Sequence, residues 1–368
     1  MTANLRQAAG SLLVVGLAGE ELAPLERAWL RLVRPAGIIL FRRNIASRQQ
    51  TRALLKESTA LCAPPYCAFV DVEGGTVDRL RDVLAPIPSV QAVAEAARTT
   101  SRAGLQRQHG ELVARAVKAF GFNSSLAPVL DLALPESRKV METRCAAANG
   151  EGVAAFAREF FAGLSAQDVA GCGKHFPGLG AGALDSHLET PKIERTWRQL
   201  WQEDLEPYRA LRDQMPMIMV NHAAYPLTAD PVHPATVSRF WMQTVLRRRI
   251  GYRGIVVSDD LEMGGVSKFM PIGEAAVATV RMGADLALIC HHPEPIFTAY
   301  EALLREGERS AAFRRILLAR AADSARKRNR AFSAKMPVAL GEKQFAALRE
   351  RILRFGEIVA KAAARGNA

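Results

Sequence analysis

The stretch GIVVSDDL, residues 254–261, is a short apolar run that ends in two carboxylates. Seven more stretches rich in β-branched and apolar residues occur along the chain, each followed by a segment with helical periodicity. They cover residues 11–19, 36–44, 66–75, 123–133, 169–178, 217–224 and 286–292. Buried strands that alternate with amphipathic segments are typical of a parallel sheet with crossover helices. The eight units predict an α/β protein with a (β/α)8 TIM-type barrel.

An open doubly wound sheet is the competing fold, but the GxGxxG turn expected after its first strand is absent. Polar residues favour the barrel, because they stand at or just past the carboxyl ends of the predicted strands, where barrel enzymes build their sites. These residues are Asp71, Asp131, Lys174, His175, Asn221, His222, Asp259, Asp260, His291 and His292.

The length of 368 residues and the apolar content of 49% suit one large core. We expect a single barrel domain over residues 1–300, followed by C-terminal helices over 301–368 that pack on it or extend from it. The apolar run at 11–19 is short and leads into charged sequence, so we interpret it as a first strand and not as a secretory signal. No apolar run approaches the ~20 residues that span a bilayer, so we expect no membrane insertion.

The cysteine content and the charge of the chain indicate its redox compartment and its kind of partner. Five scattered cysteines without a CxxC pair predict neither a disulfide framework nor a thiolate zinc site, and they favour a reducing cytoplasm. The net charge of +12 is concentrated after residue 300, as in RKRNR at 326–330, which could touch nucleic acid or anionic lipid. Without interleaved aromatic residues, solvated helix faces are the favoured interpretation, so we expect no nucleic-acid partner. The sequence does not define the oligomeric state, and a monomer is our expectation.

The stretch GKHFPGLGAGALDSH, residues 173–187, joins a strand-end Lys174 and His175 to a glycine-rich loop. Asp185 and His187 stand two apart, so on an extended loop both side chains project to the same side and the carboxylate can polarise the imidazole. Such a histidine can donate and recover a proton near neutral pH. The alternative is that Asp185 is a turn residue and His187 a surface histidine.

Two carboxylate clusters complete the candidate site. Alternation along a strand predicts that only one of Asp259 and Asp260 faces the cavity, although both could instead cap the following helix. In VDVEGGTVDRLRD, residues 70–82, Asp71, Glu73 and Arg79 surround a Gly-Gly turn. Carboxylate and guanidinium groups on opposite walls can grip vicinal sugar hydroxyls.

Two other chemistries compete with this interpretation. The strand-end histidines and Asp259 could gather around a metal, but a zinc hydrolase barrel is expected to have histidines on its first strands, and here they have none. Lys174 would suit a Schiff-base lyase, which needs an apolar pocket or nearby cations and not several carboxylates. We therefore expect no catalytic metal and no organic cofactor.

Together the motifs resemble glycoside hydrolase family 3, in particular its single-domain bacterial β-N-acetylglucosaminidases of peptidoglycan recycling. The similarity runs from about residue 12 to about residue 300, through VGLAG, GIILFRRNI, DVEGGTVDRLR, APVLDL, KHFPG, DSH and SDDLEM. The resemblance implies a cytoplasmic, retaining, exo-acting enzyme. It would remove terminal β-linked GlcNAc from muropeptides or other β-GlcNAc glycosides by double displacement.

Carried over by motif, the resemblance implies that Asp259 is the nucleophile and Asp260 its neighbour. His187 is then the acid/base on a mobile arm, and Asp185 orients it. The positions that match sugar contacts are Asp71, Arg79, Arg144, Lys174 and His175, and His222 and Met263 are expected to line the pocket.

Two departures from the family pattern touch the arm and the pocket rim: Leu179 stands where His is common in KHFPGHG, and Thr76 where Arg often follows EGG. Three alternatives stay open. One is a family β-glucosidase, which usually adds a second α/β domain. Another is a phosphorylase, because a neutral histidine repels phosphate less than a carboxylate does. The third is a barrel that binds sugar without cleaving it.

Overall fold

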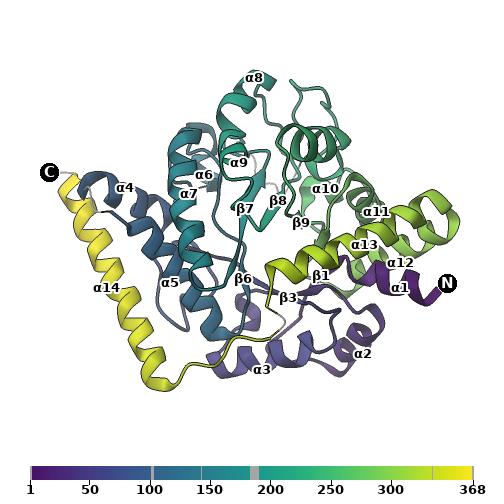
Figure 1. Cartoon of the computed structure of the whole chain (residues 1–368), viewed down its shortest axis with the longest axis horizontal. Helices are drawn as coiled ribbons and strands as arrows, with labels where there is room; N and C mark the ends of the chain where they lie inside the picture. The colour runs from purple at the N-terminus through teal and green to yellow at the C-terminus, as the bar shows by residue number, and fades with distance from the viewer. Residues whose placement is uncertain (1, 101–102, 142, 183–189, 334, 367–368) are drawn as a thin grey trace.

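The computed structural model describes every residue of the chain except 1, 101–102, 142, 183–189, 334 and 367–368. Eight parallel strands close into a barrel in the order β1, β10, β9, β8, β7, β6, β3, β2 (Figure 1). Their bounds are β1 Leu13–Gly16, β2 Gly37–Leu40, β3 Cys67–Val70, β6 Ser124–Ser125, β7 Ala170–Phe176, β8 Met217–Val220, β9 Ile255–Asp260 and β10 Leu286–Ile289. Each strand lies within one of the predicted stretches, so the (β/α)8 barrel prediction is confirmed.

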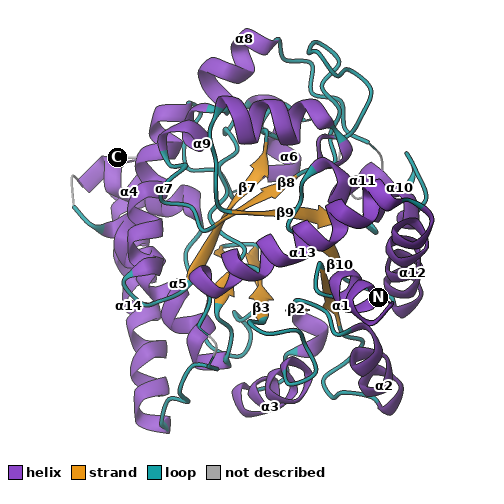
Figure 2. Cartoon of the chain, turned by 45° about the vertical axis from the view of Figure 1, so that its right-hand side comes forward, coloured by secondary structure: helices purple, strands orange, loops and turns teal. Residues whose placement is uncertain are grey.

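Helices surround the strands on all sides of the barrel (Figure 2). The longer ones are α1 Thr2–Gly10, α2 Pro24–Val33, α3 Arg48–Thr59, α4 Val90–Thr100, α5 Leu105–Phe120, α7 Gly150–Ser165, α11 Ile272–Met282, α12 Pro293–Arg309, α13 Ala311–Ala331 and α14 Glu342–Gly366. Short helical pieces are η1 Arg42–Asn44, η2 Pro135–Ser137, α6 Arg138–Met141, α8 Trp197–Gln199, α9 Glu206–Ala210, η4 Ala235–Val237 and α10 Gly264–Ser267, and π-helical turns form η3 Leu200–Asp204 and η5 Phe240–Arg249. A small antiparallel hairpin, β4 Val72–Gly74 and β5 Val77–Asp78, follows β3.

The side chains of β9 alternate between two apolar layers. Ile255 and Val257 belong to the cluster that fills the barrel, whereas Val256 packs with the surrounding helix layer. Asp259 continues the inward series by its spacing of two. The strand therefore carries its apolar residues through the barrel and presents a carboxylate at the carboxyl end.

The C-terminal end of α13 closes the opposite, amino end of the barrel. Phe332 joins the interior cluster, with its ring 6.0 Å from that of Phe69. Arg328 is buried and donates hydrogen bonds to the backbone carbonyls of Ala63 and Pro65, which precede β3. Part of the basic RKRNR stretch thus packs into the barrel as a structural plug and is not a solvated face.

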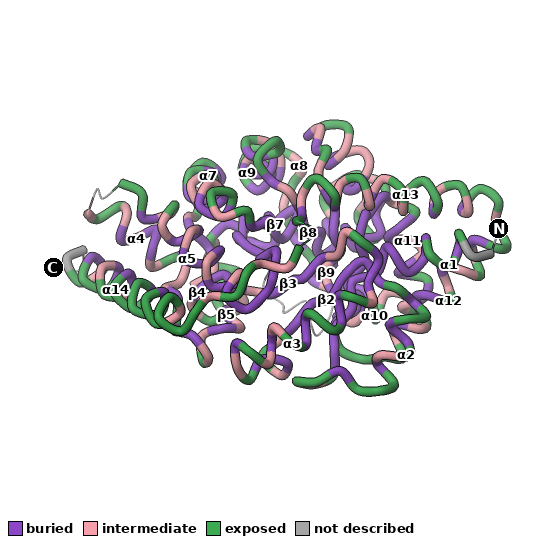
Figure 3. The backbone as a smooth tube through the Cα atoms, turned by 60° about the horizontal axis from the view of Figure 1, so that its bottom comes forward, coloured by how far each residue is buried: buried purple, intermediate pink, exposed green. Residues whose placement is uncertain are grey.

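The last helices cover two different sides of the barrel. Helix α13 packs on α1, α11 and α12, whereas α14 lies along α4 and α5 (Figure 1). The outer surface of α14 is exposed and the strands are buried (Figure 3). The boundary that we predict at residue 300 falls inside α12, and the C-terminal helices that we expect over 301–368 are the end of α12, α13 and α14. None of the helices in the described ranges has the length and apolar composition needed to cross a membrane.

Candidate active site

A cavity of about 220 Å³ opens at the carboxyl ends of the strands. Several of the predicted site residues line it: Asp71, Arg79, Arg144, Lys174, His175, Asp259 and Met263. They come from the segment after β3, from the loop after α6, and from the ends of β7 and β9. The barrel therefore brings together side chains that are as far apart in the sequence as Asp71 and Met263.

Four charged groups form a continuous network on one wall. The Lys174 ammonium lies 2.8 Å from Asp71 Oδ1 and 2.7 Å from Glu73 Oε1. Arg144 donates two parallel hydrogen bonds to the Glu73 carboxylate, at 2.8 and 2.9 Å. Arg79 lies further out, 3.7 Å from Asp71. Because two carboxylates face two inner cations, the wall is close to neutral and offers both donors and acceptors to sugar hydroxyls.

The protonation states in this network follow from the charges. Burial alone would raise the pKa of Glu73, but the nearby Arg144 and Lys174 outweigh it and hold that pKa well below its usual range. Burial alone would lower the pKa of Lys174, but the Asp71 and Glu73 charges raise it above its usual value. Lys174 therefore stays protonated, and an ammonium cannot attack a carbonyl, so the network argues against the Schiff-base alternative.

His175 is fixed from behind by Asp131. The Asp131 carboxylate lies 2.6 Å from His175 Nδ1 and also accepts the backbone N–H of Leu179 at 2.7 Å. The other ring nitrogen, Nε2, lies 3.5 Å from an Arg144 guanidinium nitrogen. Asp131 thus sets the orientation of the imidazole and also holds the first residues of the loop that follows β7.

The two neighbouring aspartates of β9 differ in exposure. Asp259 is partly exposed in the cavity, and one of its oxygens accepts the backbone N–H of Asp260 at 2.9 Å. Asp260 also touches the cavity but is only 8% exposed, and it accepts the backbone N–H of Glu262. Burial, aided by the Glu262 and Asp259 charges, raises the pKa of Asp260 to about 7. The expectation that only one of the pair would face the cavity is therefore only partly met, and Asp259 is the accessible carboxylate.

His222 does not line the cavity in the structure, although its position after β8 suggested a pocket residue. Its ring is fully buried, with Nε2 2.9 Å from the Asp260 backbone carbonyl and Nδ1 2.7 Å from the Thr236 hydroxyl. It therefore lies behind the wall, where it supports the end of β9. Among the described residues, no three His, Cys, Asp or Glu side chains are grouped so that they could hold a metal ion.

Asp185 and His187 lie outside the described residues, within 183–189. The base of their loop is described. Leu179 lines the cavity, and Thr76 is exposed beyond the end of β4. Gly178 has φ +137°, and a Cβ there would come within 2.9 Å of the Asp204 side chain. This first glycine is thus required by a close contact and a backbone conformation that other residues rarely adopt.

Asp204, under this loop, provides a test of stability against pH. It is 1% exposed with Oδ2 2.8 Å from Arg195 Nε, and burial raises its pKa to about 7 despite the arginine charge. The raised pKa means that stability is greatest at low pH and is lost as pH rises towards 7, when the buried carboxyl ionises. Asp204→Asn should therefore gain stability relative to the wild type by up to about 1.4 kcal/mol per pH unit between pH 5 and 7.

Urea unfolding of both proteins at three pH values in that interval measures the difference. The exposed carboxylate of Asp213 is the matched control, and Asp213→Asn should show no such trend. A stability difference for Asp204→Asn that does not change with pH would contradict the expectation.

Sequence reasoning named Glu73 beside Asp71 and Arg79 as a candidate sugar-binding group, but it did not predict the ion pairs with Arg144 and Lys174 that place Glu73 at the centre of the network. Its spacing of two from Asp71 in DVEGG was the available signal, because such spacing projects both carboxylates to one side of an extended segment. Phe41, at the end of β2, also lines the cavity and was not predicted. Its ring lies 5.2 Å from that of His291, and the sequence carries no pattern that joins these two residues.

Glu73→Gln should lower kcat/KM by a factor on the order of 10–100, because it leaves Arg144 and Lys174 with one carboxylate instead of two. It should also destabilise the fold by about 3 kcal/mol. Steady-state kinetics and thermal unfolding measure the two effects. The control is Glu26→Gln, which changes a buried carboxylate of α2 that accepts the backbone N–H groups of Ala18 and Ala23. It should lose stability and keep kcat/KM, and equal kcat/KM in the two variants would contradict a role for Glu73 in the site.

A parallel barrel with a small cavity of charged groups at its carboxyl end defines the chain as a barrel enzyme. Residues 4–319 match the glycosyl hydrolase family 3 N terminal domain. The beta-hexosaminidase of Alkalilimnicola ehrlichii is 40% identical over 287 residues, which cover 77% of this chain and 82% of that protein.

Two solved structures extend the similarity to the fold. A family 3 beta-N-acetylglucosaminidase from Paenibacillus sp. superposes with a TM-score of 0.84 at 30% identity, over 95% of this chain and 68% of that one. NagZ from Neisseria gonorrhoeae, in complex with N-trifluoroacetyl-D-glucosamine, gives a TM-score of 0.76 at 29% identity, over 97% and 98% of the two chains. The chain belongs to glycosyl hydrolase family 3. It is an enzyme of the glycoside hydrolase class.

Proposed function

We propose that this protein is a retaining exo-β-N-acetylglucosaminidase that removes terminal GlcNAc from peptidoglycan fragments. The observation that carries the proposal is the accessible Asp259 carboxylate in a cavity that is also lined by the near-neutral Asp71–Lys174–Glu73–Arg144 network. The volume of about 220 Å³ lies below the roughly 300–1,000 Å³ of pockets for drug-sized ligands, which suits one sugar and exo action.

The proposed reaction is a double displacement. Asp259 attacks the anomeric carbon and forms a glycosyl-enzyme, while His187, polarised by Asp185, gives a proton to the leaving glycosidic oxygen. His187 then takes a proton from water as that water attacks the anomeric carbon and releases Asp259. The ion network holds the sugar hydroxyls during both steps, and His175 and Met263 line the same subsite.

The biological setting belongs to the same proposal. The similarity to beta-hexosaminidases and to a NagZ bound to a GlcNAc analogue supports a β-GlcNAc glycoside as substrate, and we propose muropeptides as its source. Five buried, unpaired cysteines favour a reducing compartment, in keeping with the cytoplasm. We propose that the monomer is the active form.

Hydrolysis of p-nitrophenyl β-GlcNAc and the matching β-glucoside, with and without phosphate, tests the proposal directly. Release from the GlcNAc substrate with β-GlcNAc as first product by proton NMR is the expected result. A preference for the glucoside would make the protein a β-glucosidase, and GlcNAc 1-phosphate in phosphate buffer would make it a phosphorylase. Binding of GlcNAc without turnover of either glycoside or of muropeptides would leave a sugar-binding barrel.

A further inference from the structure

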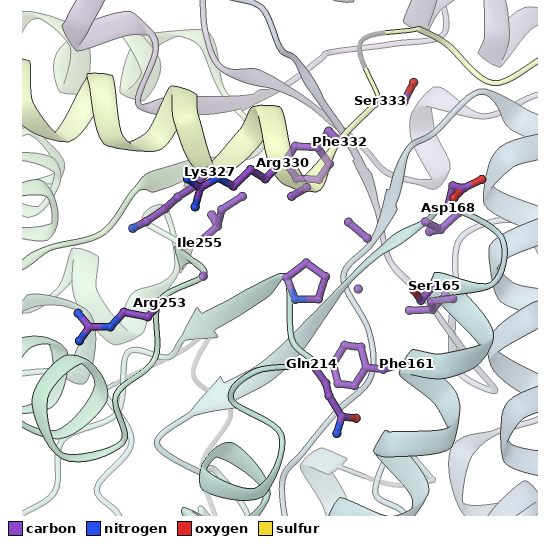
Figure 4. A pocket seen from close by; sticks show the side chains of 17 residues that line it. Phe161, Ser165, Asp168, Gln214, Arg253, Ile255, Lys327, Arg330, Phe332 and Ser333 are labelled. Carbon is purple, nitrogen blue, oxygen red and sulfur yellow. The ribbon is translucent and has the colours of Figure 1, made fainter.

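A second concave region lies at the amino end of the barrel, away from the catalytic cavity. It consists of a cavity of about 690 Å³ beside the first residues of β7 and β9, and an adjoining cavity of about 540 Å³. Arg253, Lys327 and Arg330 line both, so the two form one continuous depression, which we call the amino-end groove. Figure 4 shows these three side chains on one side of the larger cavity, with Ser165 and Asp168 on the other.

The amino-end groove is strongly basic. Its cations are Arg247, Arg253, Arg320, Arg326, Lys327 and Arg330, and they come from η5, the loop before β9, and the last turns of α13. The carboxylates that line it are Asp168 and Asp323, and Asp285 lies buried behind the cations. Six cations against three carboxylates leave a local excess of three positive charges.

The carboxylates neutralise one part of this set. Asp285 lies 2.9 Å from Arg247 and from Lys327, and 3.5 Å from Arg320. Asp323 pairs with Arg326 at 3.0 Å. These contacts form a charge-paired wall, and two cations of the groove take no part in it.

Arg253 and Arg330 are the two that remain. Both are exposed, and within the described ranges neither side chain has a hydrogen bond or an ion pair with another residue. Arg330 stands three residues after Lys327, so the two share one face of α13. Two guanidinium groups without a partner among the described residues thus line the same depression as Lys327, and an anion bound there would reduce their mutual repulsion.

The guanidinium groups and the buried floor of the groove indicate which kind of anion would bind there. Guanidinium groups form paired, parallel hydrogen bonds with phosphate oxygens, and their planar geometry favours this ligand. The apolar floor includes Phe161 and Phe332, both at least 95% buried, so they leave little ring surface on which a nucleic-acid base could stack. A recessed floor also fits a compact ligand better than a flat bilayer.

We propose that the amino-end groove binds a phosphate monoester of a small molecule through Arg253 and Arg330, beside the charge-paired wall that contains Lys327. The site is separate from the catalytic cavity and does not depend on the proposed function. It gives the basic end of α13 a binding role beside its structural one, in which Arg328 and Phe332 close the barrel.

Isothermal titration of the Asp259→Ala protein with glucose 6-phosphate, at fixed ionic strength, tests the site without catalysis. Inorganic phosphate and glucose are titrated in parallel, and vesicles containing phosphatidic acid distinguish a lipid source from a free ester. Arg253→Ser/Arg330→Ser should weaken binding of the ester at least ten-fold. The control Arg31→Ser/Arg349→Ser removes the same charge from two exposed arginines of α2 and α14, and it should bind as the parent does.

Each result decides the matter. Saturable binding of the ester that is lost in the groove variant and kept in the control supports the proposal, with or without weaker binding of inorganic phosphate. Equal losses in the two variants would show a diffuse charge effect and overturn it. Binding of vesicles without the free ester, or no binding of either, would overturn it as well. Thermal unfolding of each variant verifies the fold, which should be intact because neither groove arginine has a partner among the described residues.

Discussion

Asp259→Ala is expected to reduce turnover of p-nitrophenyl β-GlcNAc by a factor on the order of 10⁴ or more while the fold stays intact. The carboxylate provides the bond to the anomeric carbon in the first step, and neighbouring groups cannot replace it. Asp260, the nearest carboxylate in the chain, is buried and holds the backbone of Glu262. The melting temperature should equal or exceed that of the wild type, because the Asp259 charge repels the buried Asp260.

External azide gives this variant a second readout. The shortened side chain leaves room for azide on the face from which Asp259 attacks, so the product should be the α-glycosyl azide, identified by proton NMR. Turnover close to that of the wild type would remove Asp259 from the mechanism, and with it the proposed double displacement. Loss of the cooperative unfolding transition would mean that the variant tests folding instead, and Asp259→Asn would then replace it.

His187→Ala is the second variant with a large expected effect. General acid catalysis contributes about 10²–10⁴-fold, and more for poor leaving groups. We expect the rate of glycosyl-enzyme formation to fall only slightly for the p-nitrophenyl glycoside. For a disaccharide the rate should fall about 10³-fold. With the activated substrate the glycosyl-enzyme should accumulate, visible as a burst of nitrophenol. Azide should then release the β-glycosyl azide, the opposite anomer to that from Asp259→Ala.

The matched control is His233→Ala, which removes an exposed histidine that pairs with Asp230 away from the cavity. It should keep both activities. Equal losses of His187→Ala on the two substrates, with no burst and no rescue by azide, would leave the acid/base role to another group. The activity of Asp185→Asn should lie between those of the wild type and His187→Ala. This variant removes the charge that polarises the imidazole but keeps the imidazole itself.

The sequence predicted the barrel well because its signal is local. Seven of the eight barrel strands span only four to seven residues, and β9 shows the inward series of Ile255 and Val257 ending at Asp259. The same local signal predicted wrongly that His222 lines the pocket. A polar residue after a strand suggests a rim position, but the hydroxyl of Thr236 and the carbonyl of Asp260 hold its ring behind the wall.

The contacts that the sequence did not predict depend on long-range partners. The role of Glu73 exists only because Arg144 lies 71 positions further along the chain and folds back onto it. Arg328 in RKRNR has the sequence context of a surface charge. In the structure it is buried and donates a hydrogen bond to a backbone carbonyl that precedes β3. Charge patterns in the sequence therefore indicate candidate charged residues, but only the closed barrel shows which of them are in contact.

The five cysteines offer a practical consequence for experiments. All are buried, and burial raises the pKa of the Cys67 and Cys172 thiols to about 12, so thiolate-directed reagents should leave the native chain untouched. A single cysteine introduced at the exposed Thr76, close to the cavity rim, should therefore take up one maleimide fluorophore without prior removal of the native thiols. Such a conjugate would report the arrival and departure of sugars in real time, in a protein whose own residues remain unaltered elsewhere.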